Sequence, residues 1–137
     1  MEQAHPHTVK LRRTVLAGIS VVVLYYGIGQ LQYRDWVGVQ GLPRTMQEEQ
    51  AKLSLNALIN ADVVPGGDAE VENQSYRYLI TLGDAALYRP VIRHELYHVA
   101  AGHCERKVGW IKETLWYEPQ ATLYAVFDID AAGVRKR

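Results

Sequence analysis

Two histidines and a glutamate in the second half of the chain have the spacing of a metal-dependent hydrolytic site. His94, Glu95 and His98 form the pattern His-Glu-x-x-His within the segment HELYH. Residues four apart lie on one face of an α-helix, so both imidazoles can reach one metal ion. Glu95 lies one residue further round the helix, where its carboxylate can accept a proton from a metal-activated water. The motif predicts His94 and His98 as metal ligands and Glu95 as general base.

A zinc ion that keeps one coordination position open for water needs a third protein ligand. His103 follows His98 by five residues, whereas the longer signature His-Glu-x-x-His-x-x-Gly-x-x-His requires six. Cys104 has the required spacing, but position 101 is alanine where that signature has glycine. Glu105 and Glu113 are alternatives on distance along the chain alone.

Glu118 is the third ligand that the sequence favours. It opens a predicted helix of its own in the segment EPQATLYA, downstream of the His-Glu-x-x-His motif. Ala121, Thr122 and Ala125 follow it at i+3, i+4 and i+7, and such a stripe of small residues lets two helices approach closely. We therefore expect Glu118 and the two motif histidines to bind Zn²⁺.

The motif requires a helix with one buried side, and its surroundings predict one. Pro90 precedes the motif at a position that suits a first helical turn, and Gly102 follows it as a common C-terminal breaker. Ile92, Leu96 and Val99 recur at i, i+4 and i+7, on a face roughly opposite the histidines. We expect a helix between the proline and the glycine that buries this stripe and presents both histidines to a cleft.

The rest of the globular part is predicted to combine helices with a short sheet. A Ser/Thr-x-x-Glu capping pattern at Thr45 and Glu48 begins a predicted amphipathic helix over about 45–60. Residues 69–82 are predicted to be extended, since apolar positions alternate toward their end. A third helix is expected over about 116–127. The predicted fold class is α+β, with a helix, a short β-sheet, the motif helix and the Glu-bearing helix in that order.

The N-terminal part of the chain is predicted to cross a membrane once. Residues 14–33 carry no formal charge, and about 20 such residues at ~1.5 Å each cover a hydrocarbon core of roughly 30 Å. A buried helix of a soluble domain and a cleaved signal peptide are the alternatives, although no convincing cleavage site follows. Basic residues within 1–13, against Arg34 offset by Asp35 after the span, place the N-terminus in the cytoplasm.

Four segments are therefore expected: a cytoplasmic tail over 1–13, a membrane anchor over 14–33, a linker over 34–44 and an extracytoplasmic domain over 45–137. The sequence specifies no oligomeric state. Fifteen Lys and Arg against fifteen Asp and Glu leave no net charge, so the broad basic surface that binds nucleic acid is missing. The single cysteine forbids an intrachain disulfide and excludes cysteine-rich structural zinc modules.

The segments HELYHVAAGH and EPQATLYA together resemble the gluzincin branch of zinc metallopeptidases, which pair a His-Glu-x-x-His helix with a Glu from a later helix. The order of elements is most similar to the minigluzincins over residues 45–127. The resemblance implies a zincin-like fold, Zn²⁺ bound by His94, His98 and Glu118, and hydrolysis of peptide or protein substrates. It also implies that a strand within Ser75–Leu82 pairs with extended substrate through main-chain hydrogen bonds.

The main hypothesis is a membrane-anchored zinc metallopeptidase with Glu95 as its general base. One alternative is a non-catalytic metal-binding domain that serves as an envelope sensor or scaffold, although a purely structural site needs no base and tends to fill all four positions with protein ligands. Another is a small membrane interaction protein in which the motif is coincidental. An oxyanion donor near the metal is left open between Tyr97, His103, Tyr117 and Tyr124.

Overall fold

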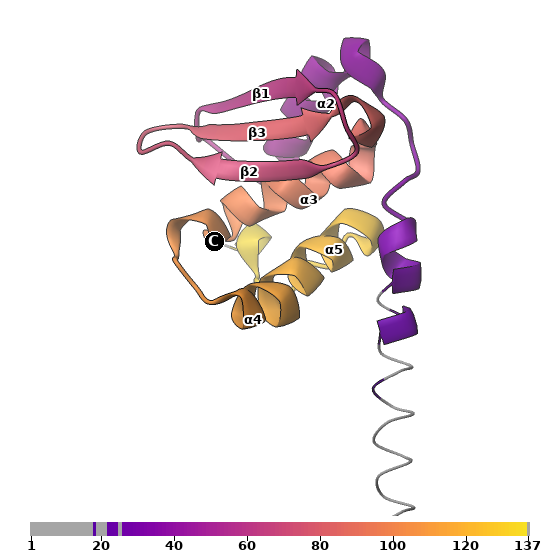
Figure 1. Ribbon diagram of the computed structural model, residues 1–137. Helices are drawn as coiled ribbons and strands as arrows, with labels where there is room; N and C mark the ends of the chain where they lie inside the picture. The colour runs from indigo at the N-terminus through magenta and orange to yellow at the C-terminus, as the bar shows by residue number, and fades with distance from the viewer. Residues whose placement is uncertain (1–17, 19–21, 25, 137) are drawn as a thin grey trace, which may run out of the picture.

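A computed structural model describes residue 18, residues 22–24 and residues 26–136. Figure 1 shows a three-stranded sheet on one side of a central helix and a second helix on the other side. The mixed α+β class is therefore as predicted. The regular elements are, in chain order, α2 (Gly38–Lys52), β1 (Ile59–Val64), β2 (Ala69–Asn73), β3 (Tyr78–Gly83), α3 (Arg89–Ala100), α4 (Trp110–Lys112) and α5 (Glu118–Phe127).

The sheet has the order β1-β3-β2, with β1 parallel and β2 antiparallel to the central β3. The prediction of one extended segment over 69–82 is wrong, because the chain turns between β2 and β3. Ser75 adopts a left-handed φ of 69°, and its amide donates to the Asn73 side chain, which is a turn that favours these residue types. Tyr76 lies at the exposed tip of this hairpin. The alternation that starts at Tyr78 therefore belongs to β3 alone.

The first helix begins and ends earlier than the predicted range of about 45–60. It starts at Gly38, within the segment expected to be a linker, and β1 already begins at Ile59. Its buried side is formed by Leu42, Met46 and Glu49 at i, i+4 and i+7. Thr45 and Glu48 thus lie inside the helix and do not cap its start. The helix begins earlier than predicted because its buried stripe already begins at Leu42.

The motif helix and the Glu-bearing helix are confirmed. The α3 helix begins at Arg89, and Gly102 follows its end with a φ of 70°, a left-handed conformation that glycine adopts without strain. Ile92 and Leu96 are fully buried, as the predicted stripe requires. The α5 helix covers most of the predicted 116–127 and continues from α4 through a π-helical turn at Glu113–Tyr117.

The predicted tail over 1–13 lies outside the described residues, and the predicted membrane span over 14–33 is described at residue 18, residues 22–24 and residues 26–33. In the part of the chain that the structure does describe, no helix is both long and apolar enough to cross a bilayer. Residues 26–30 are helical, and the chain then runs to the start of α2. The anchor and its orientation stay predictions.

A buried carboxylate on α2 ties the helices together. Glu49 is fully buried, and its Oε1 accepts hydrogen bonds from Lys52 Nζ and Arg89 Nη1, both at 2.8 Å. Its Oε2 lies 3.3 Å from Nε of Arg93, which also pairs with Asp128 just after α5. Because α3 supplies both arginines, this network fixes the helix of the motif against α2 and against the end of α5.

We predict that Glu49→Ala lowers the free energy of unfolding by about 3 kcal/mol, because Arg89 and Arg93 lose their buried partner and keep only the more exposed carboxylates of Glu48 and Asp128. Glu48→Ala is the matched control, since Glu48 pairs with Arg44 and Arg89 at the surface, where an ion pair contributes little. Urea unfolding followed by circular dichroism measures both variants. Equal losses in the two would show that burial of Glu49 is not what stabilises the helix packing.

Candidate metal centre

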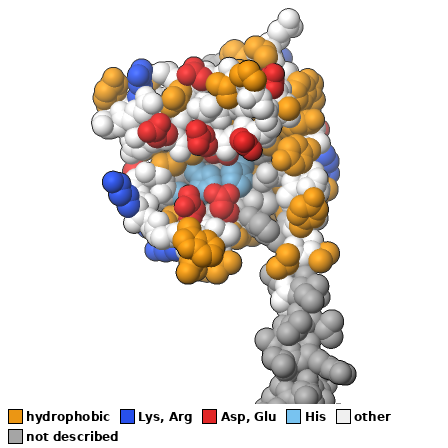
Figure 2. All heavy atoms as spheres, viewed as in Figure 1, with side chains coloured by type: hydrophobic (Ala, Val, Ile, Leu, Met, Phe, Trp, Pro, Cys, Tyr) orange, Lys and Arg blue, Asp and Glu red, His pale blue; other side chains and the backbone are white. Residues whose placement is uncertain are grey.

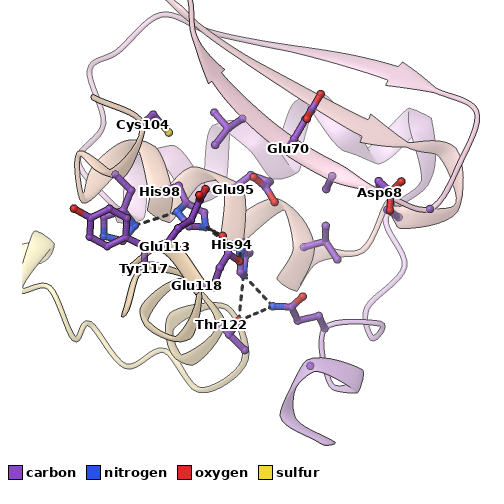
Figure 3. A pocket seen from close by; sticks show the side chains of 18 of the residues that line it. Asp68, Glu70, His94, Glu95, His98, Cys104, Glu113, Tyr117, Glu118 and Thr122 are labelled. Atoms are coloured by element: carbon purple, nitrogen blue, oxygen red, sulfur yellow. Dashed lines mark hydrogen bonds and ion pairs between the residues drawn. The ribbon is translucent and has the colours of Figure 1, made fainter. Parts of the chain in front are cut away.

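Three potential metal ligands from two helices meet at one point (Figure 3). His94 and His98 lie one turn apart on α3, and Glu118 is the first residue of α5. The two Nε2 atoms of the histidines are 3.0 Å apart. Glu118 Oε2 lies 3.0 Å from His94 Nε2, and its Oε1 lies 3.3 Å from His98 Nε2. The structure thus brings together the three side chains that the sequence predicts as ligands.

Close packing of α5 on α3 produces this arrangement. Ala121 and Ala125 are almost completely buried, and Thr122 is 4% exposed, so the stripe of small residues forms the contact with α3. Glu118 precedes this stripe by one turn and therefore reaches the histidine face of α3. A larger side chain at Ala121 would separate the two helices and withdraw the carboxylate.

The geometry and chemistry of these donors fit a divalent metal ion. In a tetrahedral site with ligands about 2.0–2.1 Å from the ion, neighbouring donor atoms lie about 3.3 Å apart. The Nε2 atoms of His94 and His98 are 3.0 Å apart, and the two oxygens of Glu118 lie 3.0 Å from the first and 3.3 Å from the second. Two imidazoles and one carboxylate are also a donor set that zinc uses in sites with an open position.

The charge state of Glu118 suits a ligand. Burial alone would raise the pKa of this carboxyl, but hydrogen bonds to His94 and His98 outweigh it and hold the pKa well below its usual range. Glu118 is therefore ionised at neutral pH. The two imidazoles and the carboxylate together provide one negative charge to offset a divalent cation.

The pKa of Glu95 is shifted in the opposite direction from that of Glu118. Glu95 lies on α3 between the two histidines, lines the same cleft and is only 7% exposed. Burial raises its pKa to about 7; His98 lowers the pKa, while the carboxylates of Glu118 and Glu70 raise it further. A carboxyl group with a pKa near neutrality can both accept and release a proton at the pH where enzymes operate.

His103 lies behind the triad and is not part of it. Its Nδ1 is 3.0 Å from Nδ1 of His98, on the opposite side of that ring from the Nε2 that faces Glu118. The ring of Tyr117 stacks on His103 with 4.0 Å between centroids and 6° between planes. Burial, and after it the proximity of His98, lowers the pKa of His103 to about 4. His103 is therefore a neutral partner that holds the His98 ring in place.

The other alternative ligands also lie outside the triad. Cys104 lines the cleft, and burial raises the pKa of its thiol to about 12, so it remains protonated. Glu105 accepts a hydrogen bond from the Tyr78 hydroxyl at 2.7 Å. Glu113 lines the cleft without joining the group of converging ligand atoms, which among the described residues contains His94, His98 and Glu118.

None of the tyrosines considered as oxyanion donors presents its hydroxyl to the triad. The Tyr97 hydroxyl donates to Asp130 and accepts from the amide of Ala132, deep in the core. The Tyr124 hydroxyl accepts from Arg135. Figure 3 shows the Tyr117 hydroxyl on the side of its ring that faces away from His94. These phenols therefore support the fold around the site, and the oxyanion donor stays unassigned.

The triad lies at the bottom of a cleft of about 870 Å³. Figure 2 shows acidic side chains on both sides of the histidines. In Figure 3, Asp68 and Glu70 lie on one side of the cleft, and Glu113 and Glu118 lie on the other. One wall is formed by β2, whose residues 69–71 line the cleft. The segment Ser75–Leu82 cannot pair with a substrate as the resemblance implied, because β3 has β1 and β2 on its two edges. The edge strand beside the cleft is β2.

No family model matches this chain, and neither a curated protein nor a solved structure matches it either.

We predict that Glu118→Ala reduces the metal content of protein purified under zinc-replete conditions from about one ion per chain to near zero, because two histidines alone hold zinc weakly. Glu113→Ala removes the same charge from the same cleft and should leave the metal content unchanged. Elemental analysis by plasma mass spectrometry measures both. Full retention in Glu118→Ala, or loss in Glu113→Ala, would move the third ligand elsewhere.

Proposed function

We propose that this chain is a zinc metallopeptidase with a zincin-like domain, in which His94, His98 and Glu118 bind the ion. The observation that carries the proposal is the convergence of these three donors beside Glu95, a buried carboxyl whose pKa is raised to about 7. A purely structural zinc site has no use for such a group. The combination of an ion site, a poised base and an open cleft favours hydrolysis over metal storage.

Each residue of the site has a distinct role in this proposal. Glu118 and the two histidines would hold the ion, which would supply a Lewis acid that polarises a carbonyl group and lowers the pKa of water. Glu95 accepts the proton of the attacking water and later delivers it to the leaving amine. Its raised pKa matches both tasks, since neither proton transfer is then strongly uphill near neutral pH.

The cleft fits an extended peptide as substrate. The outer edge of β2 has no strand partner among the described residues, and residues 69–71 line the wall above the triad. An extended peptide could add to this edge by main-chain hydrogen bonds, with a scissile bond placed over the triad. The cleft is lined by carboxylates and by the basic side chains of Arg106 and Lys107, so a bound peptide could make ion pairs with side chains of either charge.

The proposal includes attachment to a membrane by the predicted span over 14–33. The described residues 22–24 and 26–30 in this segment are helical, which agrees with the predicted form. In this arrangement the catalytic domain lies outside the cytoplasm and acts on substrates near the membrane surface.

We predict that Glu95→Gln keeps its zinc but hydrolyses peptides at least about 100-fold more slowly, because an amide cannot accept the proton. Glu105→Gln makes the same chemical change outside the cleft and should leave the rate unchanged. The measurement is cleavage of a quenched-fluorescent peptide library, with metal content determined on the same samples.

An unchanged rate in Glu95→Gln would remove Glu95 from the mechanism. A zinc-loaded wild-type chain that cleaves no member of the library would instead favour the non-catalytic metal-binding domain.

A further inference from the structure

The segment before α2 is fixed across the N-terminal end of α3. We refer to residues 31–37 as the N-terminal strap. The Val37 amide donates to the carbonyl of Leu87 at 2.8 Å, and the Arg89 amide donates to the carbonyl of Asp35 at 3.0 Å. These two hydrogen bonds run in opposite directions and hold the strap against the residues that begin the motif helix.

Aromatic side chains reinforce this attachment. Trp36 forms an isolated antiparallel β-bridge with Tyr88, and the two rings meet edge to face with 5.0 Å between centroids. Tyr33 packs on the same ring at 5.7 Å. Backbone hydrogen bonds and aromatic ring contacts therefore both hold the strap in place. As a result, residue 32 has a defined position relative to α3.

This position brings a side-chain amide to the metal centre. Gln32 Nε2 lies 2.9 Å from Nδ1 of His94 and 3.3 Å from Oγ1 of Thr122 (Figure 3). Thr122 Oγ1 is itself 3.5 Å from the same Nδ1. Nδ1 is the ring atom opposite the Nε2 that faces Glu118. Gln32 thus contacts the triad from outside without competing for the ion.

We propose that Gln32 is a positioning residue of the metal centre, which orients the His94 ring and thereby strengthens metal binding. This inference rests on the metal site of the proposed function. A histidine that binds a metal through Nε2 carries its proton on Nδ1, and a hydrogen-bond acceptor at Nδ1 fixes both the tautomer and the ring. Rotating the side-chain amide of Gln32 by about 180° exchanges the positions of Oε1 and Nε2. Oε1 then accepts a hydrogen bond from Nδ1 of His94.

The two histidines are then oriented in matching ways from opposite sides. His103 faces Nδ1 of His98 from the loop after α3, and Gln32 faces Nδ1 of His94 from the strap. The first of these partners lies close to the motif in sequence, whereas the second lies 62 residues away from its histidine. The metal centre therefore depends on Gln32, which lies at the C-terminal end of the predicted anchor over 14–33, and it is complete only with the strap in place.

The test compares zinc affinity among variants of the whole 137-residue chain, purified in a mild detergent, by competition with a chromophoric chelator. Gln32→Met keeps the size of the side chain but removes both hydrogen-bonding atoms, and we expect zinc to bind about 10–100-fold more weakly. Gln32→Glu retains an acceptor for Nδ1 and should restore an affinity at least equal to that of the wild type. Gln30→Met makes the same change two residues away, on an exposed side chain, and should have no effect.

The thermal midpoint of the metal-free protein distinguishes positioning from folding. Because the strap is held by Tyr88 and by backbone hydrogen bonds, Gln32→Met should leave this midpoint unchanged. Equal zinc affinities in the wild type and Gln32→Met, or an equal loss in Gln30→Met, would overturn the role of Gln32 while leaving the metal site intact. A wild-type chain that binds no zinc would overturn the proposed function together with this inference.

Discussion

The packing of α5 on α3 is the constraint on which the candidate site depends. Two helices come close enough for a carboxylate at the start of one to meet two imidazoles on the other only where the side chains between them are small. Ala121, Thr122 and Ala125 provide that contact and are buried to at least 96%. The ion pairs of Glu49 hold α3 from its other side, so the histidines are presented by a helix that is fixed on two faces.

Burial acts on the two glutamates of the site with different results. Both carboxyl groups lose solvent, which by itself raises a carboxyl pKa. Glu118 recovers more than this cost from hydrogen bonds to the two histidines and remains ionised. For Glu95, burial raises the pKa more than the proximity of His98 lowers it, and the pKa rises to about 7. One ligand and one base therefore arise from the same residue type within one cleft, because only one of them faces both imidazoles.

The parts of the fold that a local pattern specifies were predictable from the sequence, and the parts set by distant contacts were not. The motif helix has a proline at its start, a glycine after its end and a buried stripe, and all three signals agree. The hairpin turn at 74–77 lacks a strong glycine or proline signal, so β2 and β3 read as one extended segment. The choice of Glu118 over Glu113 could be made from the stripe of small residues. The contact of Gln32 with His94 could not, because nothing near Gln32 in the sequence indicates which helix the strap crosses.

A crystal structure of the zinc-loaded protein, with anomalous diffraction data collected on either side of the zinc absorption edge, would locate the ion directly. We expect one anomalous peak per chain, bonded to Nε2 of His94, to Nε2 of His98 and to the carboxylate of Glu118. A peak bound to other side chains, or no peak at this cleft in crystals grown with zinc, would contradict this assignment.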